Sequence, residues 1–266
     1  MAEFSTMRRC VLLVSLALLP LLGMAADSIG SYCAGNSYAG SNKAVASINS
    51  VLADLVSTAS TGGYATSTAG KGNSVIYGLA QCRGDVSSGD CAACLADAAK
   101  QLPSTCSYSS DARIWYDYCF MRYENADFIG QADSDVGVIL VNVQGMDNAK
   151  AFEKAVGKVV GKATAEASAS GSAGLGRDKD QYTPFVTIYA LAQCTRDLVP
   201  LSCAQCLSAA VSRFGDYCKA QQGCQINYSS CRVRYEIYPF YFPLAGNAGG
   251  RATTDMTKNT KIVVHP

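Results

Sequence analysis

Histidine is almost absent from this sequence: the single one among 266 residues is His265. Ser-His-Asp and Cys-His catalysis both need an imidazole held in a pocket, and a position next to the C-terminus does not offer one. A phosphate-binding loop of the form GxxxxGKS/T is missing as well. We therefore expect a protein that is not an enzyme and needs no cofactor. A glycosidase requires only two carboxylates, so Glu124 with Asp117 or Asp127 stays open as an alternative.

Net charge and long apolar runs are also scarce. The 22 basic and 21 acidic residues leave a formal charge of +1, and no basic run is longer than Arg8-Arg9. This balance provides no field to steer nucleic acid or an anionic membrane, so we expect no nucleic-acid binding. The longest apolar stretch, residues 10–23, contains Pro20 and is shorter than the about 20 residues of a membrane span.

The N-terminal segment instead matches a secretory signal peptide. A basic flank precedes the apolar run, and small residues follow at Ala25 and Ala26. We expect residues 1–26 to be removed by cleavage near Ala26, with residues 1–6 (MAEFST) as a cloning scar or an alternative start. The polar tail at 246–266 shows no second apolar span. The mature chain is therefore predicted to be secreted and extracellular, without a membrane span.

Cysteine, by contrast, is abundant, with 13 in the chain. Loss of Cys10 with the signal peptide leaves an even number, which in an oxidising compartment indicates a disulfide framework. The spacings Cys91-x2-Cys94 and Cys203-x2-Cys206 also suit zinc ligands. Secretion and the scarcity of histidine favour disulfides, and we expect no metal.

The cysteines form two sets that repeat. Five of them recur at one offset of 112 residues, and so do their neighbours: YGLAQC, ending at Cys82, matches YALAQC, ending at Cys194. Likewise CFMRYE, starting at Cys119, matches CRVRYE, starting at Cys231. A constant offset across so many positions indicates an internal duplication. We expect a first domain over 27–132 and a second over 133–245.

The sixth cysteine of each set breaks the repeat, because the first set begins with Cys33 and the second contains Cys224 instead. Six cysteines allow 15 pairings in each domain. Equivalent pairing in the two copies is a hypothesis that rests on symmetry. It gives Cys33–Cys106, Cys82–Cys91, Cys94–Cys119, Cys194–Cys203, Cys206–Cys231 and Cys218–Cys224.

Hydrophobic periodicity predicts one helix over 42–57 and another around Phe152 to Val160. Two more are expected over 89–102, where Pro103 would end the helix, and over 200–214. Strands are predicted over 113–128, 136–143 and 225–242, and a flexible loop over 168–180. The predicted fold class is α+β: two disulfide-stapled domains, each with two helices packed on an antiparallel sheet.

The spacing Cys82-x8-Cys91-x2-Cys94, which recurs from Cys194, resembles the signature of the ginkbilobin-2 or stress-antifungal domain of land plants. The Arg-Tyr-Glu endings at Glu124 and Glu236 agree with it. Tandem domains of this family occur in receptor-like kinases, in plasmodesmata-located proteins and in free secreted proteins. This chain is similar to the third kind, such as the mannose-binding antifungal proteins of maize. The resemblance implies two tandem ginkbilobin-like domains and the disulfide pairing written above for the first.

For ginkbilobin-2 itself, the family implies a mannose site of one Asn, one Arg and one Glu. By position these are Arg113 and Glu124, while the place of the Asn holds Ala34, with Asn36 two residues later as a substitute. A guanidinium fork and a carboxylate can form charge-assisted hydrogen bonds with the hydroxyls of a hexose. An Arg and a Glu at this spacing also occur as a cross-strand ion pair on a solvated face.

The second copy keeps the Glu as Glu236 but has Gln225 in place of the Arg, so we expect that site to be vestigial. Trp115, the single tryptophan, suits either sugar stacking or the core of a strand. Asn227-Tyr228-Ser229 is the one N-x-S/T sequon and a candidate for N-glycosylation if Asn227 faces solvent.

Two functions follow from these expectations. The first is a secreted, mannose-binding antifungal defence protein whose partners are mannose or mannose-containing glycans of the fungal wall. The alternative is an apoplastic protein–protein interaction module without sugar binding, whose partners would be fungal effectors or host apoplastic proteins. An unrecognised hydrolase is a further alternative beside these two.

Overall fold

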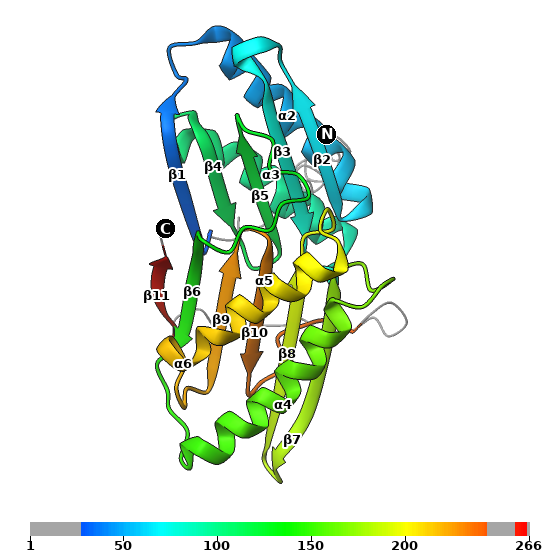
Figure 1. The fold of residues 1–266 in the computed structure, drawn as a ribbon, viewed down its shortest axis with the longest axis vertical. Coiled ribbons are helices and arrows are strands. Elements are labelled where there is room, and N and C mark those ends of the chain that lie inside the picture. The colour runs from blue at the N-terminus through cyan, green and yellow to red at the C-terminus, as the bar shows by residue number, and fades with distance from the viewer. Residues whose placement is uncertain (1–27, 244–258, 265–266) are drawn as a thin grey trace, which may run out of the picture.

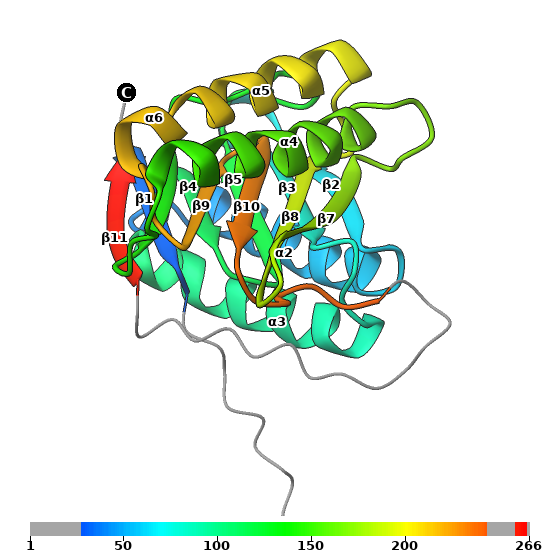
Figure 2. The same ribbon diagram turned by 90° about the horizontal axis from the view of Figure 1, so that it is seen from below.

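The computed structural model describes residues 28–243 and 259–264. Two antiparallel sheets follow one another along the molecule, and each carries helices on one face (Figure 1). Seen from below, the helices of the second copy cover one side of the molecule and those of the first copy cover the other (Figure 2). This arrangement confirms the α+β class and the duplication.

The first copy contains a five-stranded sheet in the order β1-β4-β5-β3-β2. Ser41 caps the first helix, because its side chain accepts a hydrogen bond from the backbone N–H of Ala44. The helix ends at Gly62 and is capped by Gly63, whose φ of 72° is a left-handed conformation that favours glycine. The elements are β1 (Gly30–Ser37), α2 (Asn42–Gly62), β2 (Tyr64–Ala69), a 3₁₀ turn (Gly72–Ser74), β3 (Ile76–Cys82), α3 (Ser88–Thr105), β4 (Ser109–Trp115) and β5 (Cys119–Glu124).

The second copy contains a six-stranded sheet in the order β11-β6-β9-β10-β8-β7. Its first five strands in the chain correspond to those of the first copy, and β11 adds an edge strand beside β6. The elements are β6 (Gly137–Asn142), α4 (Ala149–Ala167), β7 (Leu175–Thr183), β8 (Val186–Cys194), α5 (Pro200–Ser212), α6 (Phe214–Tyr217), β9 (Gly223–Tyr228), β10 (Cys231–Glu236) and β11 (Asn259–Val264).

Each copy has its own apolar core between the helices and the sheet. In the first, Ile48 and Leu55 of α2 and Leu95 of α3 are fully buried against the strands. In the second, Phe152 and Val159 of α4 have the same role. The helical periodicity of 42–57 and of the segment around Phe152 therefore reports the buried faces correctly.

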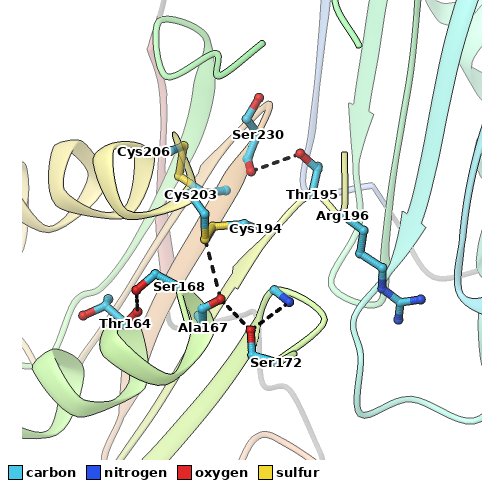
Figure 3. Close-up of a disulfide and its surroundings, with 12 residues drawn as sticks. Thr164, Ala167, Ser168, Ser172, Cys194, Thr195, Arg196, Cys203, Cys206 and Ser230 are labelled. Atoms are coloured by element: carbon cyan, nitrogen blue, oxygen red, sulfur yellow. Dashed lines mark hydrogen bonds between the residues drawn. A yellow bond between two sulfur atoms is a disulfide. The ribbon is translucent and has the colours of Figure 1, made fainter. Parts of the chain in front are cut away.

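Six disulfides fasten the helices to the sheets, in the pairs expected from the duplication. In Figure 3 the pair Cys194–Cys203 joins the end of β8 to the first turn of α5, and the Sγ atom of Cys203 lies 3.7 Å from the carbonyl oxygen of Ala167 in α4. The six are Cys33–Cys106, Cys82–Cys91, Cys94–Cys119, Cys194–Cys203, Cys206–Cys231 and Cys218–Cys224.

Several boundaries differ from the sequence-based expectation. Pro103 does not end α3, which continues to Thr105; the backbone N–H of Cys106 still donates to Leu102, and the disulfide to Cys33 holds this last turn. The expected strands over 113–128 and 225–242 are each two strands joined by a tight turn. The expected loop over 168–180 becomes β7 from Leu175 onward, because its backbone pairs with β8.

The expected polar tail at 246–266 includes a strand, since β11 pairs antiparallel with β6. The predicted signal peptide and His265 lie outside the described residues. Across 28–243 and 259–264, none of the helices combines the length and apolar character needed to cross a bilayer.

Candidate functional site

The candidate sugar residues lie on the helix-free face of the first sheet. Ala112 and Ile114 of β4 point into the core, so Arg113 between them points to the opposite face. On β5, Arg122 pairs with Arg113 and Glu124 pairs with Asp111, which places all four side chains on that face. The sheet therefore brings Arg113 and Glu124 together, as the resemblance requires.

The guanidinium of Arg113 is buried and already engaged, with its side chain only 6% exposed. Its Nε and Nη2 atoms donate to the two carboxylate oxygens of Asp111, at 3.0 and 2.8 Å. Its Nη1 atom donates to Asp133 at 2.5 Å and to the hydroxyl of Ser229 in the second copy at 2.7 Å. Burial lowers the pKa of Arg113, but the two aspartates outweigh it and raise the pKa above its usual value.

Glu124 pairs mainly with its neighbour on β5. Its Oε2 atom accepts a hydrogen bond from Arg122 at 2.5 Å and lies 3.9 Å from Arg113. Arg122 in turn contacts Asp133 at 3.2 Å and stacks on Phe128, with 3.9 Å from its Cζ atom to the ring centre. Burial, and then the charge of Arg113, lower the pKa of Arg122. Two arginines therefore lie beneath three carboxylates.

We call this group the charge cluster; its members are Arg113, Arg122, Asp111, Glu124 and Asp133. Only the carboxylates reach solvent, with side-chain exposures of 15% for Asp111, 20% for Glu124 and 19% for Asp133. The cluster can thus accept hydrogen bonds from a ligand, but the arginine fork that would donate to one is occupied.

The two remaining positions of the implied site lie on the edge strand β1. Ala34 pairs with Asp111 of β4, so it borders the charge cluster. Asn36 is exposed and lies where the register of β1 shifts, between Ala34 and Ser37. Asn36 is therefore accessible to solvent, and it lies two residues along β1 from Ala34, which borders the cluster. We call the three partly exposed carboxylates of the charge cluster its acidic rim.

The equivalent position in the second copy is closed. Glu236 is 2% exposed and pairs with Arg234 at 3.0 Å, and Phe240 stacks on Arg234 as Phe128 does on Arg122. Burial raises the pKa of Glu236. A Cβ atom at position 223 would overlap the Glu236 carboxylate, so the carboxylate packs directly against Gly223. This geometry offers a ligand no access.

The charge cluster adjoins an extensive interface between the two copies. Trp115 is 2% exposed, its Nε1 atom donates to the carbonyl of Tyr228 at 3.2 Å, and its ring packs on Phe120. It lies in an apolar cluster with Val138 and Leu140 of β6. Trp115 is therefore an interface residue and not a sugar-stacking platform.

Buried arginines span this interface in both directions. Arg232 of β10 donates to the carbonyls of Tyr116 and Asp117, at 3.0 and 2.8 Å. Arg234 pairs with Asp117 of the first copy at 3.2 Å, and Arg83 of the first copy donates to the carbonyl of Phe240 in the second at 3.3 Å. Burial lowers the pKa of Arg232 to about 10. Sequence patterns did not reveal these contacts, because each residue alone resembles an ordinary strand residue.

Asn227 does not face solvent in this structure, so the condition set for its N-glycosylation is not met. It is 0% exposed, its Nδ2 atom donates to the carbonyl of Val138 at 3.2 Å, and its Oδ1 atom accepts from Gln225 and Arg232. An N-linked glycan needs a side chain that projects into solvent. The folded interface leaves no room for one.

Asp117 and Asp127, the carboxylates named with Glu124 for a glycosidase, are held by residues outside the charge cluster. Asp117 lies in the turn before β5, at the opposite end of that strand from Glu124, and is held by Arg83 and Arg234. Asp127 is exposed in the loop after β5, where its Oδ1 atom accepts from the backbone of Ile129. Glycoside hydrolysis needs two carboxylates that flank the bond to be cleaved. Asp117, at the opposite end of β5, does not form such a pair with Glu124.

Comparison with known proteins places both copies in one family. The family model described as "Salt stress response/antifungal" matches residues 32–126 and 142–238. A cysteine-rich repeat secretory protein 55 of Arabidopsis thaliana is 45% identical over 225 residues, covering 83% of this chain and 86% of the relative. An antimicrobial ginkbilobin-2-like protein of Castanea crenata is 35% identical over 220 residues, covering 81% and 89%.

Among solved structures, the tandem DUF26 ectodomain of the Arabidopsis thaliana cysteine-rich receptor-like protein PDLP5 has the same architecture. The TM-score is 0.67 at 26% sequence identity, over 80% of this chain and 100% of that one. The tandem arrangement of the two sheets is therefore shared with an ectodomain.

Proposed function

The chain belongs to the salt stress response/antifungal family, and we propose that it acts in the apoplast as a rigid, disulfide-stapled binding module in defence, without enzymatic activity. Its N-terminal signal-like segment and its similarity to a protein named as secretory support release from the cell. The antimicrobial name of one relative and the description of the family support a role against microbes, with fungal effectors or host apoplastic proteins as partners.

The hydrogen bonds of Arg113 are the observation that favours a protein-binding module over a mannose-binding protein. Its guanidinium donates four hydrogen bonds, to Asp111, Asp133 and Ser229, and the last of these residues belongs to the second copy. A sugar that replaced these partners would leave partly buried carboxylates without a counter-charge, which costs free energy. Arg113 therefore acts as a structural link between the copies. A partner would instead bind the outer surface of the disulfide-stapled domains.

Mannose recognition is the second candidate, and the acidic rim of the charge cluster favours it. Asp111 and Glu124 keep part of their side chains in solvent, and Asn36 is exposed on the neighbouring strand. Carboxylate oxygens accept hydrogen bonds from vicinal hydroxyls. In this form of the site, the sugar would meet acceptors on the surface rather than the arginine below.

One experiment separates the two candidates. Purified oxidised protein is added to germinating fungal spores with and without excess mannose, and reduced, alkylated protein is the control. We expect inhibition that survives mannose and is lost on reduction. Inhibition that mannose abolishes, with a saturable heat of mannose binding that Glu124→Gln removes, would establish the second candidate instead. No inhibition at any concentration would refute the defence role.

A further inference from the structure

The strand β1 lies at one edge of the first sheet. It ends the strand order of that sheet, and among residues 28–243 and 259–264 the one strand that pairs with it is β4. In Figure 1 no labelled strand lies beside β1 on its outer side. An edge strand presents backbone N–H and C=O groups to which a further strand can add. The edge of β1 is therefore a place where an extended segment can join the sheet.

The strand β6 of the second copy corresponds to β1. Cys33 of β1 pairs with Ala112 of β4. In the second copy Cys224, which lies 112 positions after Ala112, pairs with Val141 of β6. Cys33 therefore corresponds to Val141, and the two edges can be compared position by position.

In the second copy this edge is covered by β11. Asn142, the residue after Val141, pairs with Asn259, and β11 runs antiparallel along all of β6. Val141 and Asn142 are 8% and 5% exposed. At the corresponding positions of β1, Cys33 is exposed and Ala34 is partly exposed. The chain thus supplies a strand of its own for one edge, and the described residues supply none for the other.

The regular part of the β1 edge is short. The register of β1 shifts between Ala34 and Ser37, and Gly35 within this shift has a left-handed φ of 73°. A β-bulge of this kind bends a strand and interrupts its regular edge. Regular pairing is therefore offered over 30–34, which suits a segment about as long as β11, with its six residues.

The sheet face beside this edge carries an excess of negative charge. The charge cluster contains three carboxylates and two guanidiniums, and only the carboxylates, its acidic rim, reach solvent. Ala34 pairs with Asp111 and shares its face of the sheet. Neighbouring strands are about 4.8 Å apart, so the Cα atom of a residue added opposite Ala34 would lie about 10 Å from that of Asp111. The short side chain of Ala34 leaves room for a lysine or arginine side chain to extend toward the rim.

We propose that the edge of β1 binds an extended segment of a partner protein, antiparallel to β1, with a basic side chain opposite Ala34. Backbone hydrogen bonds supply the affinity, as they do between β11 and β6, and the acidic rim supplies the selectivity for a basic residue. This inference rests on the proposed function, because it names the surface and the partner chemistry of the protein-binding module.

A peptide derived from β11 tests the edge. The probe is residues 257–266 of this chain with Asn259→Lys, which places a lysine opposite Ala34 if the peptide pairs as β11 does. The control peptide carries Asn259→Glu and Lys261→Glu. Binding is followed by the backbone amide NMR shifts of the oxidised protein. We expect saturable shifts over β1 and β4 with the lysine peptide, and binding of the control peptide weaker by about fivefold, as for a partly exposed charge pair.

Two lysine variants of the protein make a matched pair. Ala34→Lys places the cation on β1 itself and should weaken binding of the lysine peptide by about fivefold. Thr66→Lys adds the same charge at the opposite edge of the sheet, on β2, where Thr66 is exposed and its neighbour Ala65 faces the core. Four strand spacings, about 19 Å, separate the two edges, which exceeds the screening length of about 10 Å. Thr66→Lys should therefore bind as wild type does, and circular dichroism melts verify that both variants fold.

The proposal would be overturned by equal binding of the two peptides, by shifts confined to β6 and β11, or by equal binding to folded Ala34→Lys and Thr66→Lys. The spore assay keeps this result separate from the proposed function. Peptide binding without inhibition of spores would refute the defence role and leave the edge site in place. Inhibition of spores by a protein that binds neither peptide would overturn the edge site alone.

Discussion

Gln81 and Gln193 hold the two copies together through a reciprocal pair of hydrogen bonds. The Nε2 atom of Gln81 donates to the carbonyl of Cys194 at 2.8 Å, and the Nε2 atom of Gln193 donates to the carbonyl of Cys82 at 3.1 Å. Both glutamines, and both cysteines, are 112 positions apart. The interface between the copies is thus self-complementary, like that of a twofold symmetric dimer.

The first prediction concerns this pair. In Gln81→Ala the carbonyl of Cys194 and the backbone N–H of Arg196, which donates to the Oε1 atom of Gln81, both lose a buried partner. The free energy of unfolding should fall by about 1–3 kcal/mol for each unsatisfied group. Urea unfolding of the oxidised protein, followed by circular dichroism, measures the change. A single cooperative transition is expected, and an unchanged midpoint would contradict the role of the pair.

The second prediction treats Arg113 as a link between the copies. Arg113→Ala leaves Asp111 and Asp133 near each other without their counter-charge and should lower the free energy of unfolding by about 3–5 kcal/mol. The control is Lys158→Ala, which breaks an ion pair whose side chains are 63% and 41% exposed and should leave the midpoint unchanged. Equal effects of the two variants would show that Arg113 is a surface residue in solution.

Whether the sequence could predict a feature depends on whether that feature is set by local patterns or by contacts between distant segments. Helix faces such as that of Ile48 and Leu55 depend on local periodicity, and the cysteine framework depends on a repeat that is visible in one dimension. Both the helix faces and the cysteine framework could therefore be predicted from the sequence. The pairing of β7 was not, because the Gly- and Ser-rich stretch before Leu175 carries the signal of a loop and the strand forms only against β8.

The charge cluster shows the same limit of sequence-based prediction for a candidate functional site. The family resemblance paired Arg113 with Glu124, and the register of β4 and β5 places both side chains on one face of the sheet. The sequence could not show that Asp133, twenty residues away, and Ser229, in the other copy, occupy the guanidinium. Only the packing of the two copies brings those groups together.

The third prediction is that Asn227 carries no glycan. Its side-chain amide is fully buried and bonded to Val138, Gln225 and Arg232. Protein secreted from a plant cell should therefore yield an unmodified tryptic peptide across this sequon, and its mass should not change after treatment with a glycosidase that removes N-glycans. A glycopeptide at Asn227 in correctly folded protein would mean that the interface is arranged differently.

The fourth prediction uses the raised pKa of Glu236. Because burial disfavours its charged form, the folded protein binds a proton more tightly at this group than the unfolded chain does. Its contribution to stability is fully present below the unfolded pKa, and is lost as the pH rises through the raised folded pKa. The free energy of unfolding of wild type, relative to Glu236→Gln, should fall with rising pH across that window. A difference that rises with pH would show that Arg234 controls the group.

The fifth prediction compares the two disulfides that the copies do not share. Cys33–Cys106 spans 73 residues and Cys218–Cys224 spans 6. If a disulfide acts mainly by restricting the unfolded chain, the cost of removing it grows with the logarithm of the loop: about 4 kcal/mol for the first and about 2 kcal/mol for the second. Paired Cys→Ser variants, unfolded in urea without reductant, test the order. The opposite order of stabilities would mean that strain or contacts in the folded state, rather than loop length, set the contribution of each bond.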